Sequence, residues 1–567
     1  MKTFQTVELS LEELEAVVGR VDRDELAEGD AAIIRAAVGT IKLLYAVLEE
    51  KNISIKRLKR IIFGAKTEKT KTVLKDQQDG QNSGSESEEK GAGDEPAVAE
   101  NAIASVRDQV GKEQQSEQAA QEKKKPKGHG RNGAKDYRGA ERVIVCHPTL
   151  KPGDRCPECP KGRLYDTDRP AVIIRLVGRS PVQATVYELQ RLRCSPCGKL
   201  FCAELPEGCG DEKYDRSVGS IIALLKYGGG FPFNRLAKLQ KNFSVPLPPS
   251  TQWDLVDTRV NRIYPAYDEL VRQAAQGEII HNDDTPAKIV ELMKENQDIR
   301  QQDSGSDSRT GMFTTGILSK CGDQKIALFF TGRNHAGENI GRVLQHRDED
   351  RSPPIQMCDA LSRNVPKDFA VILANCLLHA RRNFVDVAEI FPQECSYVLE
   401  ILKKVYRNDA QAKLRQMPYE QRLHFHQTES GPLMEELKLW LQDQNQPPTF
   451  EPNSSMGQAT SYMRDHWEPL TLFLRRPGAP LDNTICERVL KKAVLHRKNS
   501  LLYKTLHGAY VGDVFMSIIH TCELASMNAF EYLNTLEEHS SELFRQPEAW
   551  LPWNYHLQLT AASNQPA

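Results

Sequence analysis

The chain has 567 residues, 39% of them apolar, and its 75 basic and 77 acidic residues give a formal net charge of −2. This length predicts three or four structural units and allows a sizeable buried core. No stretch reaches the roughly 18 apolar residues of a membrane span, and the N-terminus lacks a secretory signal pattern. We therefore expect neither a membrane, nor a secreted, nor a collagen-like protein. Taken alone, the near-zero net charge also argues against a nucleic-acid partner.

The charge is unevenly distributed along the chain. Residues 76–122 hold twelve acidic and three basic residues with few large apolar ones, which predicts a disordered linker. Residues 123–142 are strongly basic, and residues 488–504 hold six Lys or Arg and no acid. Neutrality is thus the sum of an acidic tether and basic patches, a pattern typical of phosphate-binding proteins. The alternative for each basic run is solvated surface.

The N-terminal region, residues 1–70, is predicted to be helical. Apolar residues recur there every seven positions: Ile34, Ile41, Leu48, Ile55 and Ile62. This heptad pattern predicts a coiled coil and hence self-association. A long amphipathic helix packed on its own domain is the alternative. We assign residues 71–140 to the disordered linker with its basic end.

Residues 141–210 contain two Cys-x-x-Cys pairs: Cys156, Cys159, Cys194 and Cys197. Two such pairs complete a tetrahedral Zn²⁺ site, and four thiolates leave no open position, so the predicted zinc is structural. A hairpin of strands over 172–176 and 185–189 would bring the pairs together. Disulfides are the competing interpretation, but an intracellular setting keeps thiols reduced. We expect a small zinc-ribbon-like β module.

The rest of the chain mixes helical and strand patterns. Residues 211–276 are predicted to be a helical DNA-binding region, broken at Pro232 and at the prolines of 246–249. Residues 277–536 are predicted to form an α/β core with a helical insertion at about 381–480. Residues 537–567 are expected to be a C-terminal tail. Predicted core strands lie at 278–283, 312–318, 325–331 and 355–359, with a helix at 339–345.

Acidic residues stand at the ends of two predicted strands. Asp283 and Asp284 end the first, Asp359 ends another, and Glu487 lies on a helix that Asp482 or Asn483 could cap. Carboxylates converging from strand ends and a helix can bind two Mg²⁺ ions and support in-line phosphoryl transfer. A strand-end Asp that only forms a turn is the alternative.

Longer motifs contain these acids, in a fixed order behind the cysteine pairs. They are Asn282-Asp-Asp-Thr-Pro286, Gln356-Met-Cys-Asp359, Cys376-Leu-Leu-His-Ala-Arg-Arg-Asn-Phe384, Leu481-Asp-Asn-Thr-Ile-Cys-Glu-Arg488 and His496-Arg-Lys-Asn499. In this order the chain resembles the insertion-sequence-sixty-six family of bacterial transposases, over roughly residues 55–536.

The resemblance implies a ribonuclease-H-like core whose triad, Asp283, Asp359 and Glu487, binds two Mg²⁺ or Mn²⁺ ions. Asp284 stands where the family has Glu, and it is the other candidate for the first ligand. Ala-Leu-Ser follows Asp359 where the family usually has Gly-Tyr, and Ser500 replaces a common aromatic residue.

The resemblance also favours phosphate contacts near the active site. The residues concerned are His379, Arg381, Arg382, Arg488, Lys491, Lys492, Arg497 and Lys498. Such contacts position DNA without specifying its sequence. For His379 the alternative is an ordinary core or surface histidine, and for the arginines it is solvation.

We therefore expect a DNA transposase that binds element ends, cleaves a strand and joins the 3′-hydroxyl to target DNA. Its expected partners are terminal-repeat and target DNA, a second copy of the chain, and small accessory transposition proteins. The resemblance implies a bacterial cytoplasmic protein acting at the nucleoid. The alternatives are a zinc-dependent DNA-binding protein without catalytic activity and a stand-alone nuclease of the same fold.

Overall fold

A computed structural model of the chain describes residues 212–301, 309–443 and 450–563, together with parts of 142–210. The predicted N-terminal coiled coil and the linker lie outside the described residues. Contacts between residues divide the chain into one compact unit over 110–188 and a second that comprises the remaining residues. The two units are described separately below.

In the smaller unit, a short antiparallel pairing surrounds the first cysteine pair in the sequence. Gly153 N–H donates to the carbonyl of Leu164 at 2.8 Å, and Arg155 and Arg163 form a bridge. Cys156 and Cys159 themselves lie outside the described residues. The strand expected at 185–189 is not formed, and its apolar residues are exposed. Alternating apolar residues form a stable strand only where a sheet partner covers one face.

The second unit begins with a similar short pairing. Strand β1 (Arg191–Arg193) pairs with β2 (Leu200–Cys202) in antiparallel fashion. The second cysteine pair lies between these strands in the sequence, outside the described residues.

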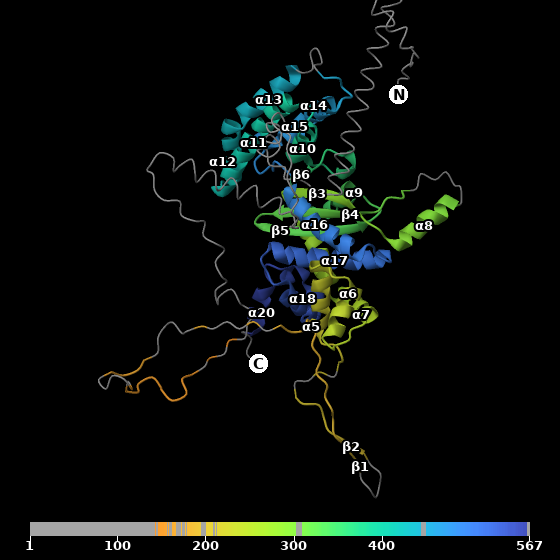
Figure 1. Cartoon of the computed structure of the whole chain (residues 1–567), viewed down its shortest axis with the longest axis vertical. Helices are drawn as coiled ribbons and strands as arrows, with labels where there is room; N and C mark the ends of the chain where they lie inside the picture. The colour runs from red at the N-terminus through yellow and green to blue at the C-terminus, as the bar shows by residue number, and fades with distance from the viewer. Residues whose placement is uncertain are drawn as a thin grey trace, which may run out of the picture. The chain divides into compact units, whose positions relative to one another are not determined.

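A five-stranded mixed sheet forms the centre of this unit (Figure 1). Its strands are β3 (Ile279–Pro286), β4 (Phe313–Cys321), β5 (Gln324–Gly332), β6 (Ile355–Cys358) and β7 (Ile372–Asn375). The order across the sheet is β5-β4-β3-β6-β7. Strands β5, β4 and β3 form an antiparallel meander, whereas β6 and β7 run parallel to β3. The expected α/β class is confirmed.

Helices surround the sheet. Before and within the strand region they are α5 (Arg216–Ala223), the π-helix η3 (Leu224–Gly228), α6 (Phe233–Asn242), α7 (Pro249–Ala275), α8 (Val290–Gln301), α9 (Ala336–Leu344) and the 3-10 turn η4 (Ser362–Asn364). The insertion holds α10 (Leu377–Val387), α11 (Pro392–Leu414), α12 (Tyr419–Glu429), α13 (Gly431–Asp443), α14 (Ser455–Asp465), α15 (Trp467–Leu470) and η5 (Leu472–Leu474). The C-terminal part holds α16 (Thr484–Ser500), α17 (Leu506–Leu524), α18 (Ala529–Glu538), α19 (Ser540–Arg545), η6 (Pro547–Trp550) and α20 (Tyr555–Ser563). Among the helices of the described stretches, none combines the length and apolarity needed to cross a membrane.

Prolines set the helix boundaries before the sheet, as predicted. Pro232 precedes α6, and Pro248 precedes α7, whose first residue is also proline. Because proline lacks an N–H and has a fixed φ, it fits the start of a helix better than the interior. α7 has buried residues along most of its 27-residue length, so it is a core element as well as part of the expected DNA-binding region.

The C-terminal segment is more ordered than the expected tail. Helices α19, η6 and α20 follow α18, and Trp550 and Tyr555 are buried. Tyr532 of α18 donates its hydroxyl to the carbonyl of Trp550 at 2.7 Å. Two aromatic residues in a polar stretch supply enough apolar area to pack a short segment against a helix.

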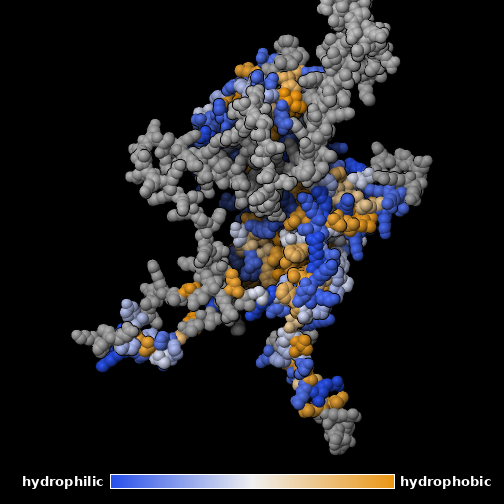
Figure 2. Space-filling view, viewed as in Figure 1, coloured by the Kyte–Doolittle hydropathy of each residue, from blue (hydrophilic) through white to orange (hydrophobic). Residues whose placement is uncertain are grey.

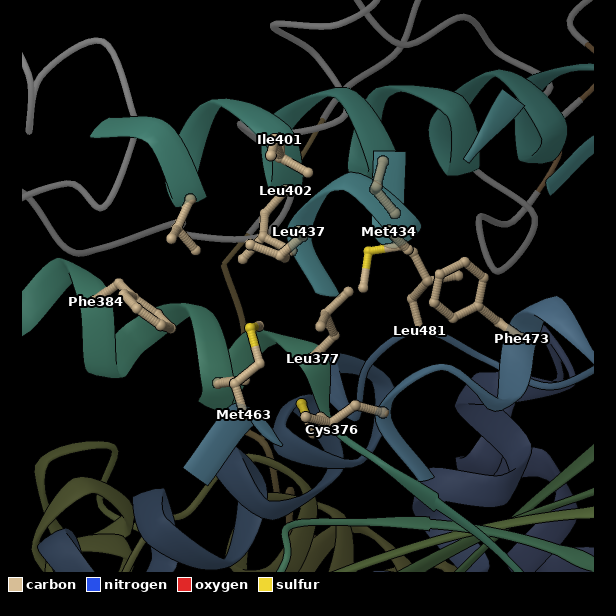
Figure 3. Close-up of a cluster of buried hydrophobic side chains, with 14 of the residues drawn as sticks. Cys376, Leu377, Phe384, Ile401, Leu402, Met434, Leu437, Met463, Phe473 and Leu481 are labelled. Atoms are coloured by element: carbon tan, nitrogen blue, oxygen red, sulfur yellow. The ribbon is translucent and has the colours of Figure 1, made fainter. Parts of the chain in front are cut away.

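One hydrophobic core extends from the sheet into the insertion (Figure 3). Met357 of β6 belongs to the same buried cluster as Phe384 of α10, Leu402 of α11 and Leu437 of α13. The insertion is therefore packed continuously with the sheet, and its helices stabilise the strands that carry the candidate site.

Helix α17 covers the outer edge of the sheet. Along β5, the outward N–H groups of Ala327, Phe329 and Thr331 donate to the side chains of Thr521, Ser517 and Asp513 at 3.1, 3.0 and 2.6 Å. Two residues along a strand span about 6.8 Å, and four residues along a helix span about 6 Å. The outward N–H groups of β5 and the side chains on one face of α17 therefore have similar spacings. Side chains of the helix thus satisfy the strand edge that would otherwise be open.

This edge contact predicts a dependence of stability on pH. Burial raises the pKa of Asp513 to about 7, whereas an unfolded Asp titrates near 3.9. Between these values the folded chain binds more protons than the unfolded one, so stability falls as pH rises from about 4 to 7. Between pH 5 and pH 8, we expect the free energy of unfolding to fall by about 2–3 kcal/mol less in Asp513→Asn than in the native chain, as measured by urea unfolding. Asp323→Asn, at an exposed turn, is the control. Parallel profiles for Asp513→Asn and the native chain would contradict the assignment.

Candidate active site

One amide fixes the helix of the third acidic residue to the central strand. Asn483 Nδ2 donates to the carbonyl of Asn282 at 2.9 Å, and its Oδ1 lies 3.1 Å from Nδ1 of His281. Burial lowers the pKa of His281 to about 3, so the ring is neutral and its Nδ1–H donates to Asn483. These contacts hold the first turn of α16, which contains Glu487, against β3.

Two adjacent residues at the start of α16 have different roles: one caps the helix, and the other contacts β3. Asp482 Oδ1 accepts the N–H of Thr484 at 3.0 Å and so satisfies one free donor of the first turn. Asn483 occupies the N-cap position, but its side chain turns to β3 instead of capping the helix. Its own N–H donates to Cys376 Sγ at 3.3 Å, immediately before α10.

A glycine lets α16 lie close to the sheet beside Asp283. Gly316 of β4 pairs with Asp283 in the β3–β4 register, and Cys486 Sγ donates to its carbonyl at 3.3 Å. A Cβ at position 316 would lie 2.8 Å from Leu490 of α16. Any larger residue would therefore push the helix away from the strand.

Asp283 and Asp284 lie on opposite faces of β3, because side chains alternate along a strand. Asp284 Oδ1 accepts the hydroxyl of Thr315 at 2.6 Å, and its Oδ2 accepts the N–H of Ala336 at 3.0 Å at the start of α9. Its Oδ2 also lies 3.2 Å from Nδ1 of His335. The hydrogen bonds of the Asp284 carboxylate thus hold α9 against β3. The Asp283 carboxylate lies on the opposite face of the strand and takes no part in these contacts.

The three predicted acids share one electrostatic environment. Burial raises the pKa of Asp283 to about 7, and the charges of Asp359, Glu487 and Asp284 add to this effect. The N–H of Asp284, 2.8 Å from Asp283 Oδ1, opposes it. Glu487 Oε1 is buried and has no hydrogen-bond donor. The structure therefore brings the charges of Asp283, Asp359 and Glu487 together.

Buried amides orient Asp359 after β6. Asn364, at the end of η4, donates from Nδ2 to Asp359 Oδ1. Its own carbonyl accepts from Gln356 Nε2 at 2.6 Å and from Asn282 Nδ2 at 3.0 Å. Gln356 Nε2 also lies 2.9 Å from Asn282 Oδ1. The turn built by Ala-Leu-Ser therefore returns to the sheet through an amide network that fixes one Asp359 oxygen.

The insertion also contacts this turn. The backbone N–H of Ala360 donates to the hydroxyl of Tyr462 on α14. Burial, with the nearby charge of Asp359, raises the pKa of Tyr462 to about 12. A side chain of the insertion thus lies beside the second predicted acid and remains a neutral phenol.

The acids fit a hard divalent cation in their chemistry. Within the described ranges, no three His, Cys, Asp or Glu side chains are close enough together to hold a metal ion. Charges act over longer distances than metal–oxygen bonds of about 2 Å, so electrostatic coupling does not require ligand spacing. Carboxylate oxygens suit Mg²⁺, and Glu487 Oε1 lacks any other partner. Asp283, Asp359 and Glu487 remain the predicted ligands of such an ion.

A model of the family described as transposase IS66 family matches residues 213–510, more than half of the chain. The chain belongs to this IS66 transposase family. The uncharacterized protein y4jD of Sinorhizobium fredii (strain NBRC 101917 / NGR234) is 26% identical over 356 residues. That alignment covers 60% of this chain and 66% of y4jD, slightly under two thirds of its length. The uncharacterized protein y4hP of the same strain is 24% identical over 444 residues, 73% of this chain and 75% of y4hP.

Three of the basic residues predicted to contact DNA lie exposed on one stripe of α16 in this member of the IS66 transposase family. Arg488, Lys491 and Lys498 are exposed, and their spacing places them with Leu495 on the face that also carries Glu487. Phosphate contact by this stripe remains a prediction.

Two further basic residues of α16 are engaged within the protein. Arg497 Nη1 donates to Thr285 Oγ1 at 3.0 Å and to the carbonyl of Pro286, which joins the end of α16 to the end of β3. Lys492 pairs with Glu523 of α17 at 3.0 Å.

The predicted contacts on α10 are less accessible. Arg381 is 7% exposed, and His379 and Arg382 are partly buried. Nδ1 of His379 is buried without a hydrogen-bond partner. Their contact with DNA also remains a prediction.

Sequence analysis did not identify Gln356, Asn364 or Tyr462 as site residues. A role for Gln356 could have been predicted, because it is a polar residue within a short apolar strand and buried polar residues usually have hydrogen-bond partners. No sequence feature pointed to Asn364 or Tyr462, because their positions depend on the turn after β6 and on the packing of the insertion.

The burial of Asp283, together with repulsion from the neighbouring acids, leads to a stability prediction. Because its folded pKa is raised above the unfolded value near 3.9, ionisation destabilises the chain as pH rises from about 4 to 7. At pH 8 with a chelator, we expect Asp283→Asn to raise the free energy of unfolding by about 1–3 kcal/mol. Adding Mg²⁺ should stabilise the native chain but not the variant, by urea unfolding. A variant that is less stable in chelator would contradict the prediction.

The amide network leads to a separate prediction. Asn364→Ala should leave Asp359 free to rotate and weaken the apparent Mg²⁺ affinity about 10–100-fold, as lost supporting contacts commonly do. Mg²⁺-dependent shifts in melting temperature would measure it. Asn453→Ala, at an exposed position of the insertion, is the matched control. Equal Mg²⁺ responses of the two variants would show that the network does not orient the ligand.

Proposed function

We propose that this chain is the DNA transposase of a bacterial insertion sequence, with a ribonuclease-H-like catalytic core. Its membership of the family supports this, as does the order of an antiparallel meander followed by two parallel strands. The observation that carries the proposal is the shared electrostatic environment of Asp283, Asp359 and Glu487.

Bound Mg²⁺ or Mn²⁺, as two ions, would activate the attacking oxygen and stabilise the leaving oxygen of an in-line phosphoryl transfer. Asp283, on the central strand of the sheet, would bind such ions as a carboxylate, without its proton. Asn364 holds Asp359 in orientation, and Asn483 holds the helix of Glu487. Water is the first nucleophile, at the element end, and the freed 3′-hydroxyl is the second, at the target.

Regions outside the core would bind the DNA and pair its ends. A structural Zn²⁺ held by Cys156, Cys159, Cys194 and Cys197 is proposed from the two Cys-x-x-Cys pairs of the sequence. We place end binding in this module, the basic linker end and residues 211–276. Self-association through residues 1–70 would hold two ends together, at the bacterial nucleoid and with small accessory proteins.

The test uses the full chain and duplexes from the DNA on either side of its coding sequence, with Mg²⁺ and a target plasmid. We expect one duplex to be bound, cleaved and joined. Asp359→Asn and Glu487→Gln should lower cleavage at least about 10³-fold, equivalent to about 4 kcal/mol of barrier, without loss of binding. Asp323→Asn is the control.

Each other outcome would indicate a different function for the chain. Salt-dependent binding without cleavage under any metal would indicate a DNA-binding protein without catalysis. Cleavage without joining would indicate a nuclease. If Asp359→Asn cleaved at the native rate, the assignment of the triad would be wrong.

A further inference from the structure

We propose that Leu501 and Leu502 form an apolar wedge that enters a base step of the bound DNA duplex. The inference rests on the proposed function and adds a DNA-distorting site to it. The two side chains are 66% and 40% exposed directly after α16. Both leucines expose apolar surface at the end of the helix that carries Glu487.

The backbone at this point is strained. Leu501 has φ 68° and ψ −45°, and Leu502 N–H donates to the carbonyl of Ser500 at 2.8 Å. This is a γ-turn with positive φ, a rare conformation in which a side chain is disfavoured. Such strain persists only where the surrounding structure enforces it, and it is concentrated at functional sites.

Contacts on both sides hold the turn rigid. Tyr503 N–H donates to the carbonyl of Lys288 at 2.9 Å, and its own carbonyl accepts from Val290 at the same distance. The Tyr503 ring stacks on His496 with centroids 4.8 Å apart. Before the turn, Lys226 Nζ donates to Ser500 Oγ at 2.8 Å. The leucines are therefore presented by a fixed turn and not by a frayed helix end.

The surroundings of the turn fit a nucleic-acid duplex. The exposed stripe of Arg488, Lys491 and Lys498 leads from Glu487 to the turn, and Lys504 is exposed just beyond it. Carboxylates also lie beyond the turn: that of Glu291 accepts Leu506 N–H at 2.7 Å, and Oδ1 of Asp257 lies 2.6 Å from Nε2 of His507. On the face that carries α16 and α17, hydrophilic and hydrophobic residues lie next to one another (Figure 2).

Cations around an apolar tip complement an anionic backbone with stacked bases inside it. Proteins that distort DNA insert leucine and similar side chains between base steps in this way. Interfaces between proteins are instead depleted of lysine, so a second protein chain fits this surface less well.

The helix sets the expected position of the wedge. Fourteen helical steps separate Glu487 from Leu501, which corresponds to about 21 Å along the axis. For a duplex that runs parallel to α16, with about 3.4 Å per base pair, the wedge would enter about six base pairs from the cleaved phosphate.

The experiment places 2-aminopurine at successive positions, 2 to 12 pairs from the cut, in the flanking-DNA duplex that the full chain cleaves. The native complex should show a fluorescence rise confined to about 5–7 pairs from the cut. Leu501→Ala/Leu502→Ala should lose the rise and bind about 10-fold more weakly, while cutting at the same phosphate. Leu501→Met should keep the rise, and Leu439→Ala, an exposed leucine of α13, is the control.

The outcomes separate the two proposals. If the native chain cleaves the duplex with no rise at any position, the wedge is refuted and the transposase proposal stands. If the double variant keeps the rise but shifts the oligomeric mass in light scattering, the leucines are a protein contact and the wedge is refuted. If the native chain neither binds nor cleaves any flanking duplex, both proposals fail.

Discussion

The geometry of the candidate site depends on the attachment of α16 to β3. Asn483 makes the attachment at the start of the helix through His281 and the Asn282 carbonyl, and Arg497 repeats it near the end through Thr285. A helix held at two points cannot rotate or slide on the sheet. Glu487, the basic stripe and the turn at Leu501 therefore keep fixed positions relative to Asp283, so one attachment determines both the acids and the exposed surface beside them.

Much of this arrangement could be predicted from the sequence, because strand ends and motif order are local features. The expected core strands and the mixed α/β class are found, and Asp359 directly follows the end of β6. The strand expected to end at Asp283 instead continues to Pro286, because β4 pairs with it along that length. Which of Asp283 and Asp284 faces Glu487 depends on strand register, which only pairing with β4 and α9 determines. The network around Asn364 and the edge contact of Asp513 join residues distant in the sequence, and single polar residues carry no pattern that predicts such contacts.

The insertion is part of the same folding unit as the sheet. Its helices bury residues in one hydrophobic cluster (Figure 3), to which β6 also contributes. Tyr462 lies beside the turn after Asp359. Changes in the packing of α11 to α14 can thus reach the second acid through few contacts. The long separation between Asp359 and Glu487 in the sequence is bridged in space by a shared core, which links the stability of the insertion to the shape of the site.

The covered edge of β5 has a consequence for assembly. An open strand edge lets another chain add a strand by backbone hydrogen bonding, which is a common route to dimers and to aggregates. Here the outward N–H groups of Ala327, Phe329 and Thr331 already have partners on α17. Copies of this chain therefore cannot join by adding a strand at that edge. An assembly on this side of the sheet must use side-chain surfaces, which can be specific for a partner in a way that a bare backbone edge cannot.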